Sequence, residues 1–160
     1  MRSIIQAGCF ALALGIDASR LLSIPGLDAG PLLFVALTVW FSMRAGPLGG
    51  GAWGFSGGLA LGLLYADSSL GARVLGGLLA GSVPVSLRRL LFWRRWPGQV
   101  ALGALAALLF DLTLLIAGLA RGNLVGRPGS LLPGLALDAS LTGVACPLLV
   151  RLMSRLERAG

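Results

Sequence analysis

The stretch "GGGAWGFSGGLALG", Gly49 to Gly62, decides between a soluble cofactor-binding fold and a membrane fold. It contains Gly49-x-Gly51-x-x-Gly54, which matches the glycine pattern of a dinucleotide-binding turn. That turn needs a strand before the glycines and a helix after them, so that backbone N–H groups meet a pyrophosphate in water. Here an apolar segment ending at Arg44 precedes the glycines, and a leucine-rich run follows them. The surroundings therefore predict a glycine-rich membrane helix without a cofactor loop.

The composition is typical of a membrane protein. Of the 160 residues, 56% are hydrophobic and 12% are charged, and the mean hydropathy is +0.89. A soluble domain carries about 25% charged residues. Apolar runs of about 20 residues, enough to cross a hydrocarbon core of roughly 30 Å, recur along the chain. The sequence predicts a single polytopic membrane domain over residues 1–160.

Proline, glycine and arginine divide the chain into six apolar segments, each predicted to be a membrane helix. The expected fold is an all-α integral membrane protein, a bundle of six transmembrane helices. Segment 28–43 is short for a span, so it either stands upright in a thinned bilayer or is only partly exposed to lipid. Pro84 and Pro147 should bend their helices, because each removes a backbone hydrogen bond. The predicted helices cover residues 3–24, 28–43, 47–66, 70–93, 97–120 and 130–153.

The arginines predict the orientation. With the N-terminus inside, nine arginines fall on the cytoplasmic side, namely Arg2, Arg44, Arg88, Arg89, Arg94, Arg95, Arg151, Arg155 and Arg158. Four fall on the other side, namely Arg20, Arg73, Arg121 and Arg127. An excess of basic residues in cytoplasmic loops predicts that both termini are cytoplasmic.

The basic residues also indicate a partner. The net charge is +7, and the arginines cluster between apolar runs instead of along one polar face. Anionic lipid is therefore the expected partner, and nucleic acid is not. Within "RRLLFWRRW" the sequence predicts inner-leaflet anchors, namely Arg88, Arg89, Trp93, Arg94, Arg95 and Trp96.

The glycines of the opening stretch recur every four residues. At this spacing they lie on one face of a helix, where a neighbouring helix can approach to backbone contact. Helix 70–93 has a comparable face. The two faces either pack against each other within the chain or meet a second protein. The predicted packing residues are Gly50, Gly54, Gly58, Gly62, Gly77 and Gly81.

Three aspartates lie within predicted spans. Asp17, Asp111 and Asp138 all fall roughly 10 to 14 Å from the outer ends of their helices at the helical rise. Arg20 is one turn from Asp17 on the same face and can pair with it. Intramembrane carboxylates are costly and call for a reason. They either line a polar cavity that is open to the outer face, or hold the bundle together through hydrogen bonds between helices.

Catalysis has little support in the sequence. There is no histidine, and neither a nucleophile–base pair nor a cluster of metal-ligand type is apparent. Cys9 and Cys146 both fall within apolar runs, which suits small core residues. We therefore expect no catalytic, cofactor or metal site, and no enzymatic activity.

Two segments carry a family resemblance. "MRAGPLGGGAWGFSGGLALGLLYADSSLG", Met43 to Gly71, resembles the central signature of the MreD family of rod shape-determining proteins, which has an arginine-glycine-proline turn, a glycine-rich helix and an aspartate before a small-residue turn. "LLPGLALDASLTGVACPLLVRLMSRLE", Leu131 to Glu157, is similar to the last helix of that family. The resemblance implies a fold similar to the S components of energy-coupling-factor transporters.

The resemblance also implies a function. It predicts a non-enzymatic scaffold of the bacterial cell-elongation machinery in the inner (cytoplasmic) membrane, which supports rod shape and peptidoglycan synthesis. The implied partners are MreC and, through MreC, the RodA glycosyltransferase, a class B penicillin-binding protein and MreB filaments. A second copy of this chain is a further candidate partner. The alternative is a substrate-binding S component of a vitamin transporter, with a small solute in the outer polar layer.

Overall fold

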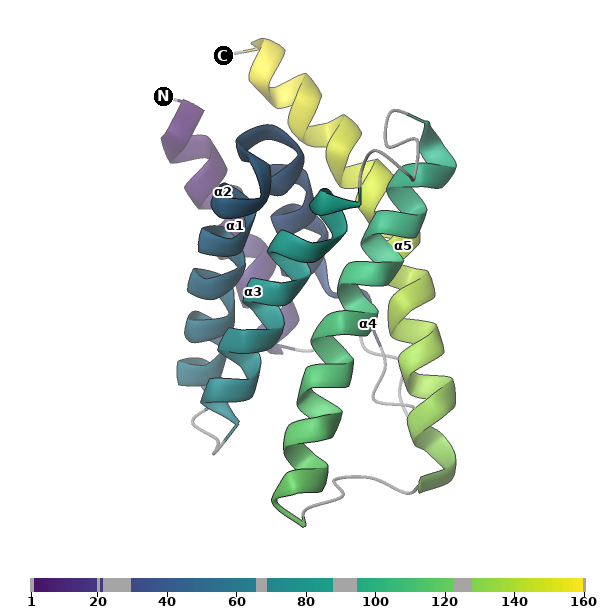
Figure 1. Cartoon of the computed structure of the whole chain (residues 1–160). Helices are drawn as coiled ribbons and strands as arrows, with labels where there is room; N and C mark the ends of the chain where they lie inside the picture. Colours follow the sequence, from purple (N-terminus) through teal and green to yellow (C-terminus); the bar gives the residue numbers. More distant parts are fainter. Residues whose placement is uncertain are drawn as a thin grey trace.

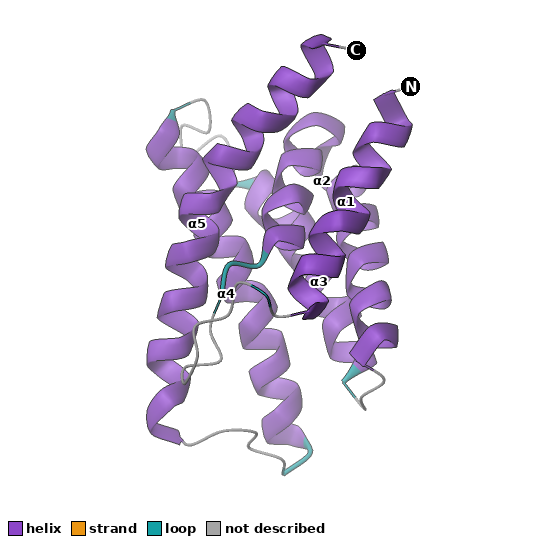
Figure 2. Cartoon of the chain, turned by 180° about the vertical axis from the view of Figure 1, so that it is seen from behind, coloured by secondary structure: helices purple, strands orange, loops and turns teal. Residues whose placement is uncertain are grey.

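The computed structural model describes residues 2–19, 21, 30–65, 69–87, 95–122 and 128–159. All regular structure in these residues is helical (Figures 1 and 2). Helix α1 begins and helix α5 ends at the same end of the molecule (Figures 1 and 2). The helices are α1 (Arg2–Ser19), α2 (Leu33–Tyr65), α3 (Leu70–Ser86), α4 (Trp96–Ala120) and α5 (Pro128–Ala159).

The prediction of a six-helix bundle is wrong: the described residues form five helices. The predicted helices 28–43 and 47–66 are two arms of the single helix α2. They join at Gly46, whose φ of 81° and ψ of −177° interrupt the helical geometry. A positive φ is readily adopted by glycine, and the following Pro47 has no N–H group to leave unpaired. The chain therefore changes direction at one residue, without a separating loop.

The first arm of α2 lies inside the bundle. Every residue from Phe34 to Met43 is buried. From Leu33 to Met43 the arm is about 16 Å long at the helical rise, which is well short of a hydrocarbon core. The alternative of partial lipid exposure, proposed for segment 28–43, is thus closer to the structure than an upright span.

Aromatic side chains pack around this arm. Phe41 stacks on Trp53 of the second arm, with ring centroids 4.2 Å apart, and Phe10 of α1 meets Trp53 edge-on at 4.9 Å. Phe34 meets Phe110 of α4 edge-on at 5.1 Å. Such aromatic pairs stabilise the packing beyond the burial of apolar area, and they connect both α1 and α4 to α2.

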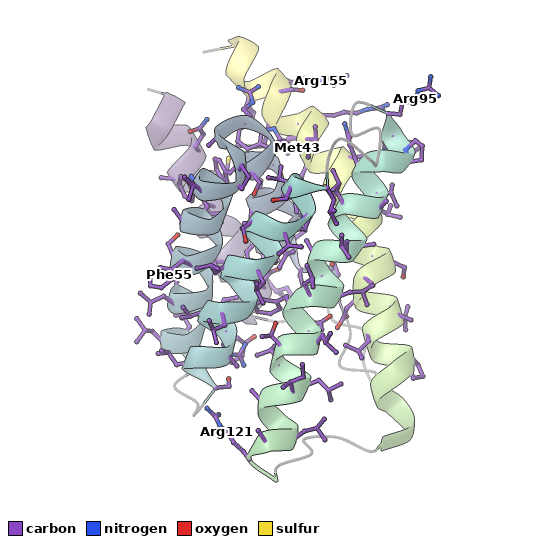
Figure 3. All side chains as sticks on the ribbon, in the orientation of Figure 1. Met43, Phe55, Arg95, Arg121 and Arg155 are labelled. Atoms are coloured by element: carbon purple, nitrogen blue, oxygen red, sulfur yellow. The ribbon has the colours of Figure 1, made fainter. Side chains whose placement is uncertain are left out.

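Two helices of the described residues are long and apolar enough to cross a membrane, namely Trp96–Ala120 and Pro133–Leu156. Helix α4 exposes Leu108, Leu112, Ile116 and Leu119, which share one face at helical spacing. Phe55 on the second arm of α2 points outward in the same way (Figure 3). Exposed apolar stripes of this kind are compatible with a lipid environment.

Candidate functional site

The glycine face of α2 is in contact with α3. A Cβ atom built at Gly54 would overlap the carbonyl group of Gly77, and one at Gly50 would overlap the carbonyl oxygen of Gly81. Gly58 faces the backbone of Arg73 in the same way. At Gly62 the contact is looser, since an added Cβ would lie 3.1 Å from Leu70. The two helices approach to backbone contact over three successive turns, which only glycine permits.

The contact between α2 and α3 also stabilises the bend of α2 at Gly46. The Ser42 hydroxyl lies 2.5 Å from the carbonyl oxygen of Gly81 and 2.7 Å from that of Thr38. A Cβ at Gly50 would also overlap the Ser42 side chain. Ser42 in the first arm, Gly50 in the second arm and Gly81 in α3 therefore meet at one point, so the face is shared by three helical segments of this chain.

Helix α3 has a second glycine contact. A Cβ at Gly76 would lie 3.0 Å from the Phe110 ring and 3.1 Å from the Thr113 hydroxyl, both on α4. Gly77 and Gly81 face α2, and Gly76 faces α4, so α3 lies between them (Figure 1). The sequence predicts contacts for Gly77 and Gly81 but does not distinguish these two sides of α3.

Asp17 holds the N-terminus of α2. One carboxylate oxygen accepts a hydrogen bond from the backbone N–H of Leu33 at 3.1 Å, and the other accepts one from Phe34 at 2.8 Å. The first N–H groups of a helix have no partner within that helix. Leaving such a group buried and unpaired costs about 1–3 kcal/mol.

Helix α5 holds the residues just before α2 in the same manner. Asp138 accepts a hydrogen bond from the N–H of Gly30 at 2.7 Å, and the buried Thr142 hydroxyl accepts one from Leu32 at 3.0 Å. Pro31, between them, has no N–H. Every backbone N–H from Gly30 to Phe34 thus donates to a side chain of α1 or α5.

Tyr65, the last residue of α2, contacts the end of α1. Its hydroxyl donates towards the backbone carbonyls of Asp17 at 3.2 Å and Ala18 at 3.4 Å. The last carbonyls of a helix also lack partners within it. Asp17 therefore lies where α1 is joined to both ends of α2, a connection that helical periodicity does not reveal.

Asp111 differs from the other two aspartates. It interacts electrostatically with Asp138, but its Oδ2 atom is buried without a hydrogen-bond partner among the described residues. The structure therefore brings Asp111 and Asp138 near each other, while the contacts of Asp17 are to the start of α2. Arg20, the predicted partner of Asp17, lies outside the described residues.

The structure describes two of the six predicted inner-leaflet anchors, Arg95 and Trp96. Arg88, Arg89, Trp93 and Arg94 lie outside the described residues. Arg95 is the N-cap residue of α4, and Trp96 is exposed. Above the Trp96 ring lies the guanidinium of Arg151 from α5, 5.4 Å from the ring centroid. This contact between α4 and α5 was not predicted from the sequence.

Within the described ranges, no group of three or more His, Cys, Asp or Glu side chains could hold a metal ion. Cys146 is buried against Gly103, and Cys9 is partly buried; both are free thiols. No protein-family model, curated protein or solved structure matches this chain.

Proposed function

We propose that this chain is a multi-pass scaffold in the bacterial inner membrane, which supports rod shape and peptidoglycan synthesis through MreC. In this role it belongs to the MreD family and performs no chemistry. MreC links it to RodA, a class B penicillin-binding protein and MreB. Its task is to present a rigid set of helix faces to the membrane segment of MreC.

The proposal rests on two intramembrane carboxylates that act as hydrogen-bond acceptors within the fold. Asp17 and Asp138 accept hydrogen bonds from backbone N–H groups at the start of α2. A carboxylate engaged in this way serves the fold, because releasing it to a solute would leave buried N–H groups unpaired. This favours a scaffold over the S-component alternative, which needs a solute in that layer.

The segments behind the family resemblance have a structural role that suits a scaffold. Residues 43–71 contain the second arm of α2 and the start of α3, and so supply one side of the glycine contact. A pair of helices in backbone contact resists separation, and it can present a fixed outer surface to a partner. The second segment, residues 131–157, lies within α5, which binds the start of α2 through Asp138 and Thr142.

We further propose that both termini face the cytoplasm. Support comes from the common end at which α1 begins and α5 ends, because Arg95 and Arg155 lie at that end as well (Figure 3). Arg121 lies at the opposite end (Figure 3). An excess of arginine on the side of the termini is the pattern of a cytoplasmic face.

Cross-linked affinity purification tests the proposal. The tagged chain is expressed at its native level in its own bacterium, cross-linked in the membrane, purified and analysed by mass spectrometry, with an unrelated tagged multi-pass protein as the control. We expect specific enrichment of an MreC-type protein with a large extracytoplasmic domain. Enrichment of an ATPase with its membrane coupling subunit, without MreC, would instead support the transporter alternative.

A further inference from the structure

Arg151 and Trp96 form a contact that the proposed scaffold role does not explain. The Arg151 guanidinium is 5.4 Å from the Trp96 ring centroid, and both side chains are exposed. A guanidinium over an indole ring gains a cation–π attraction and keeps its N–H donors available at the edge of the plane. The contact therefore holds an arginine in a defined orientation at the surface of the bundle.

The position of this contact along the bundle follows from α4. Helix α4 begins at Trp96 and contains 25 residues, so it is about 37 Å long at the helical rise and spans a hydrocarbon core of roughly 30 Å. Trp96 then lies at one membrane surface, the level that tryptophan prefers. Arg151 touches Trp96 and therefore lies at headgroup level too.

Two further arginines lie close to this pair in the sequence. Arg155 is four residues after Arg151 and shares its face of α5, and Arg95 directly precedes Trp96. Both are exposed at the same end of the molecule (Figure 3). Arg95 supplies no side-chain cap to α4, so the positive end of the helix dipole adds to the three guanidinium groups.

We propose that Arg95, Arg151 and Arg155 bind the phosphate of an anionic phospholipid headgroup against Trp96. The occupant is a lipid because the three charges lie at headgroup level beside apolar helix surface, and because guanidinium groups pair with phosphate through parallel N–H donors. The inference rests on the membrane placement in the proposed function and does not involve MreC.

Lipid titration followed by native mass spectrometry tests this site. The full chain is purified in mild detergent and titrated with phosphatidylglycerol or with phosphatidylcholine of the same acyl chains. We expect phosphatidylglycerol to bind more tightly. Replacing one arginine by an uncharged residue should lower the affinity for phosphatidylglycerol about fivefold, since each basic residue near an anionic surface contributes about that factor to binding.

Matched variants make the result specific. Arg151→Gln should bind phosphatidylglycerol about fivefold more weakly, Arg151→Lys should lose less, and Arg121→Gln at the opposite end should bind it as tightly as the wild type. If Arg151→Gln does not fold, Arg155→Gln provides the same comparison. Equal affinity for the two lipids, or an equal loss in Arg121→Gln, overturns the proposal. Neither result depends on whether MreC is a partner, so this test and that of the scaffold fail separately.

Discussion

The carboxylate of Asp17 in α1 accepts a hydrogen bond from the backbone N–H of Phe34 at 2.8 Å. This contact joins the first helix of the chain to the buried start of α2. Phe34 is fully buried, so water does not compete for its N–H. In this way a carboxyl group within an apolar segment, which usually suggests a functional site, has a structural role.

Removing the Asp17 carboxylate should destabilise the chain. Asp17→Ala leaves the N–H groups of Leu33 and Phe34 without their partner, at about 1–3 kcal/mol each. Asp17→Asn retains one acceptor oxygen and should lose less. The thermal unfolding midpoint in detergent should fall in the order wild type, Asp17→Asn, Asp17→Ala. Ser19→Ala is the matched control, because its exposed hydroxyl donates a hydrogen bond to the Ile16 carbonyl of the same helix. An Asp17→Ala midpoint equal to that of the control would contradict the capping role.

A methyl group at the centre of the glycine contact should force α2 and α3 apart. In Gly54→Ala the new Cβ would overlap the backbone of Gly77, which cannot rotate away as a side chain can. Overpacking of this kind costs about 1–3 kcal/mol. Gly71→Ala is the control, since a Cβ there meets nothing within 4 Å. We expect a lower thermal midpoint for Gly54→Ala alone. Equal midpoints for the two variants would show that the helices are not in backbone contact.

Neutralising Asp111 should be tolerated. Its Oδ2 atom has no hydrogen-bond partner among the described residues, and its carboxyl group lies near that of Asp138. Asp111→Asn puts a permanently neutral group of nearly the same shape at this position. We expect an unchanged or higher thermal midpoint and normal recovery of MreC in cross-linked purification. Loss of partner recovery by a stably folded Asp111→Asn protein would indicate that this carboxylate serves function directly.

Cysteine labelling checks the proposed orientation. In spheroplasts, Arg121→Cys should react with a membrane-impermeant maleimide, and Arg155→Cys should react only after permeabilisation. Both arginines are exposed in the structure. The wild-type chain, which has Cys9 and the buried Cys146, gives the background signal. The reverse labelling pattern would place the termini outside the cell and contradict the count of arginines.

Helix α4 shows what hydropathy and punctuation can predict. The sequence predicts a helix over residues 97–120, and α4 covers Trp96–Ala120. The run is uniformly apolar, Pro97 suits a first helical turn, and the chain turns at Gly122, where φ is positive. These signals are local, so they do not depend on how the rest of the chain packs.

Helix α2 shows what local signals leave open. Glycine and proline at residues 46 and 47 interrupt the helical geometry as expected, yet no loop separates the two arms of α2. Whether such a pair makes a loop or a bend depends on the packing of both arms, including the contact between Ser42 and Gly81. The sequence therefore predicts six helices where the described residues form five.

Part of the candidate site could be predicted from the sequence. A shared depth for Asp17 and Asp138 follows from counting residues along helices. Their hydrogen-bond partners cannot be found in this way. These partners are backbone N–H groups, and that of Gly30 is 108 residues away from Asp138 in the sequence. An unsatisfied helix start is a general signal for such partners, but the sequence does not show that α2 begins inside the bundle.

Cell shape after depletion of this chain in its own bacterium tests the proposed role most directly. Width and length are measured by microscopy as the protein is lost, with the wild-type chain and Gly71→Ala expressed from a second locus as controls. If the chain supports rod shape, depleted cells widen and become round, and both controls restore rods. Cells that keep their dimensions after the chain is lost would contradict the proposed function, and loss of uptake of one solute in those cells would identify a transporter subunit.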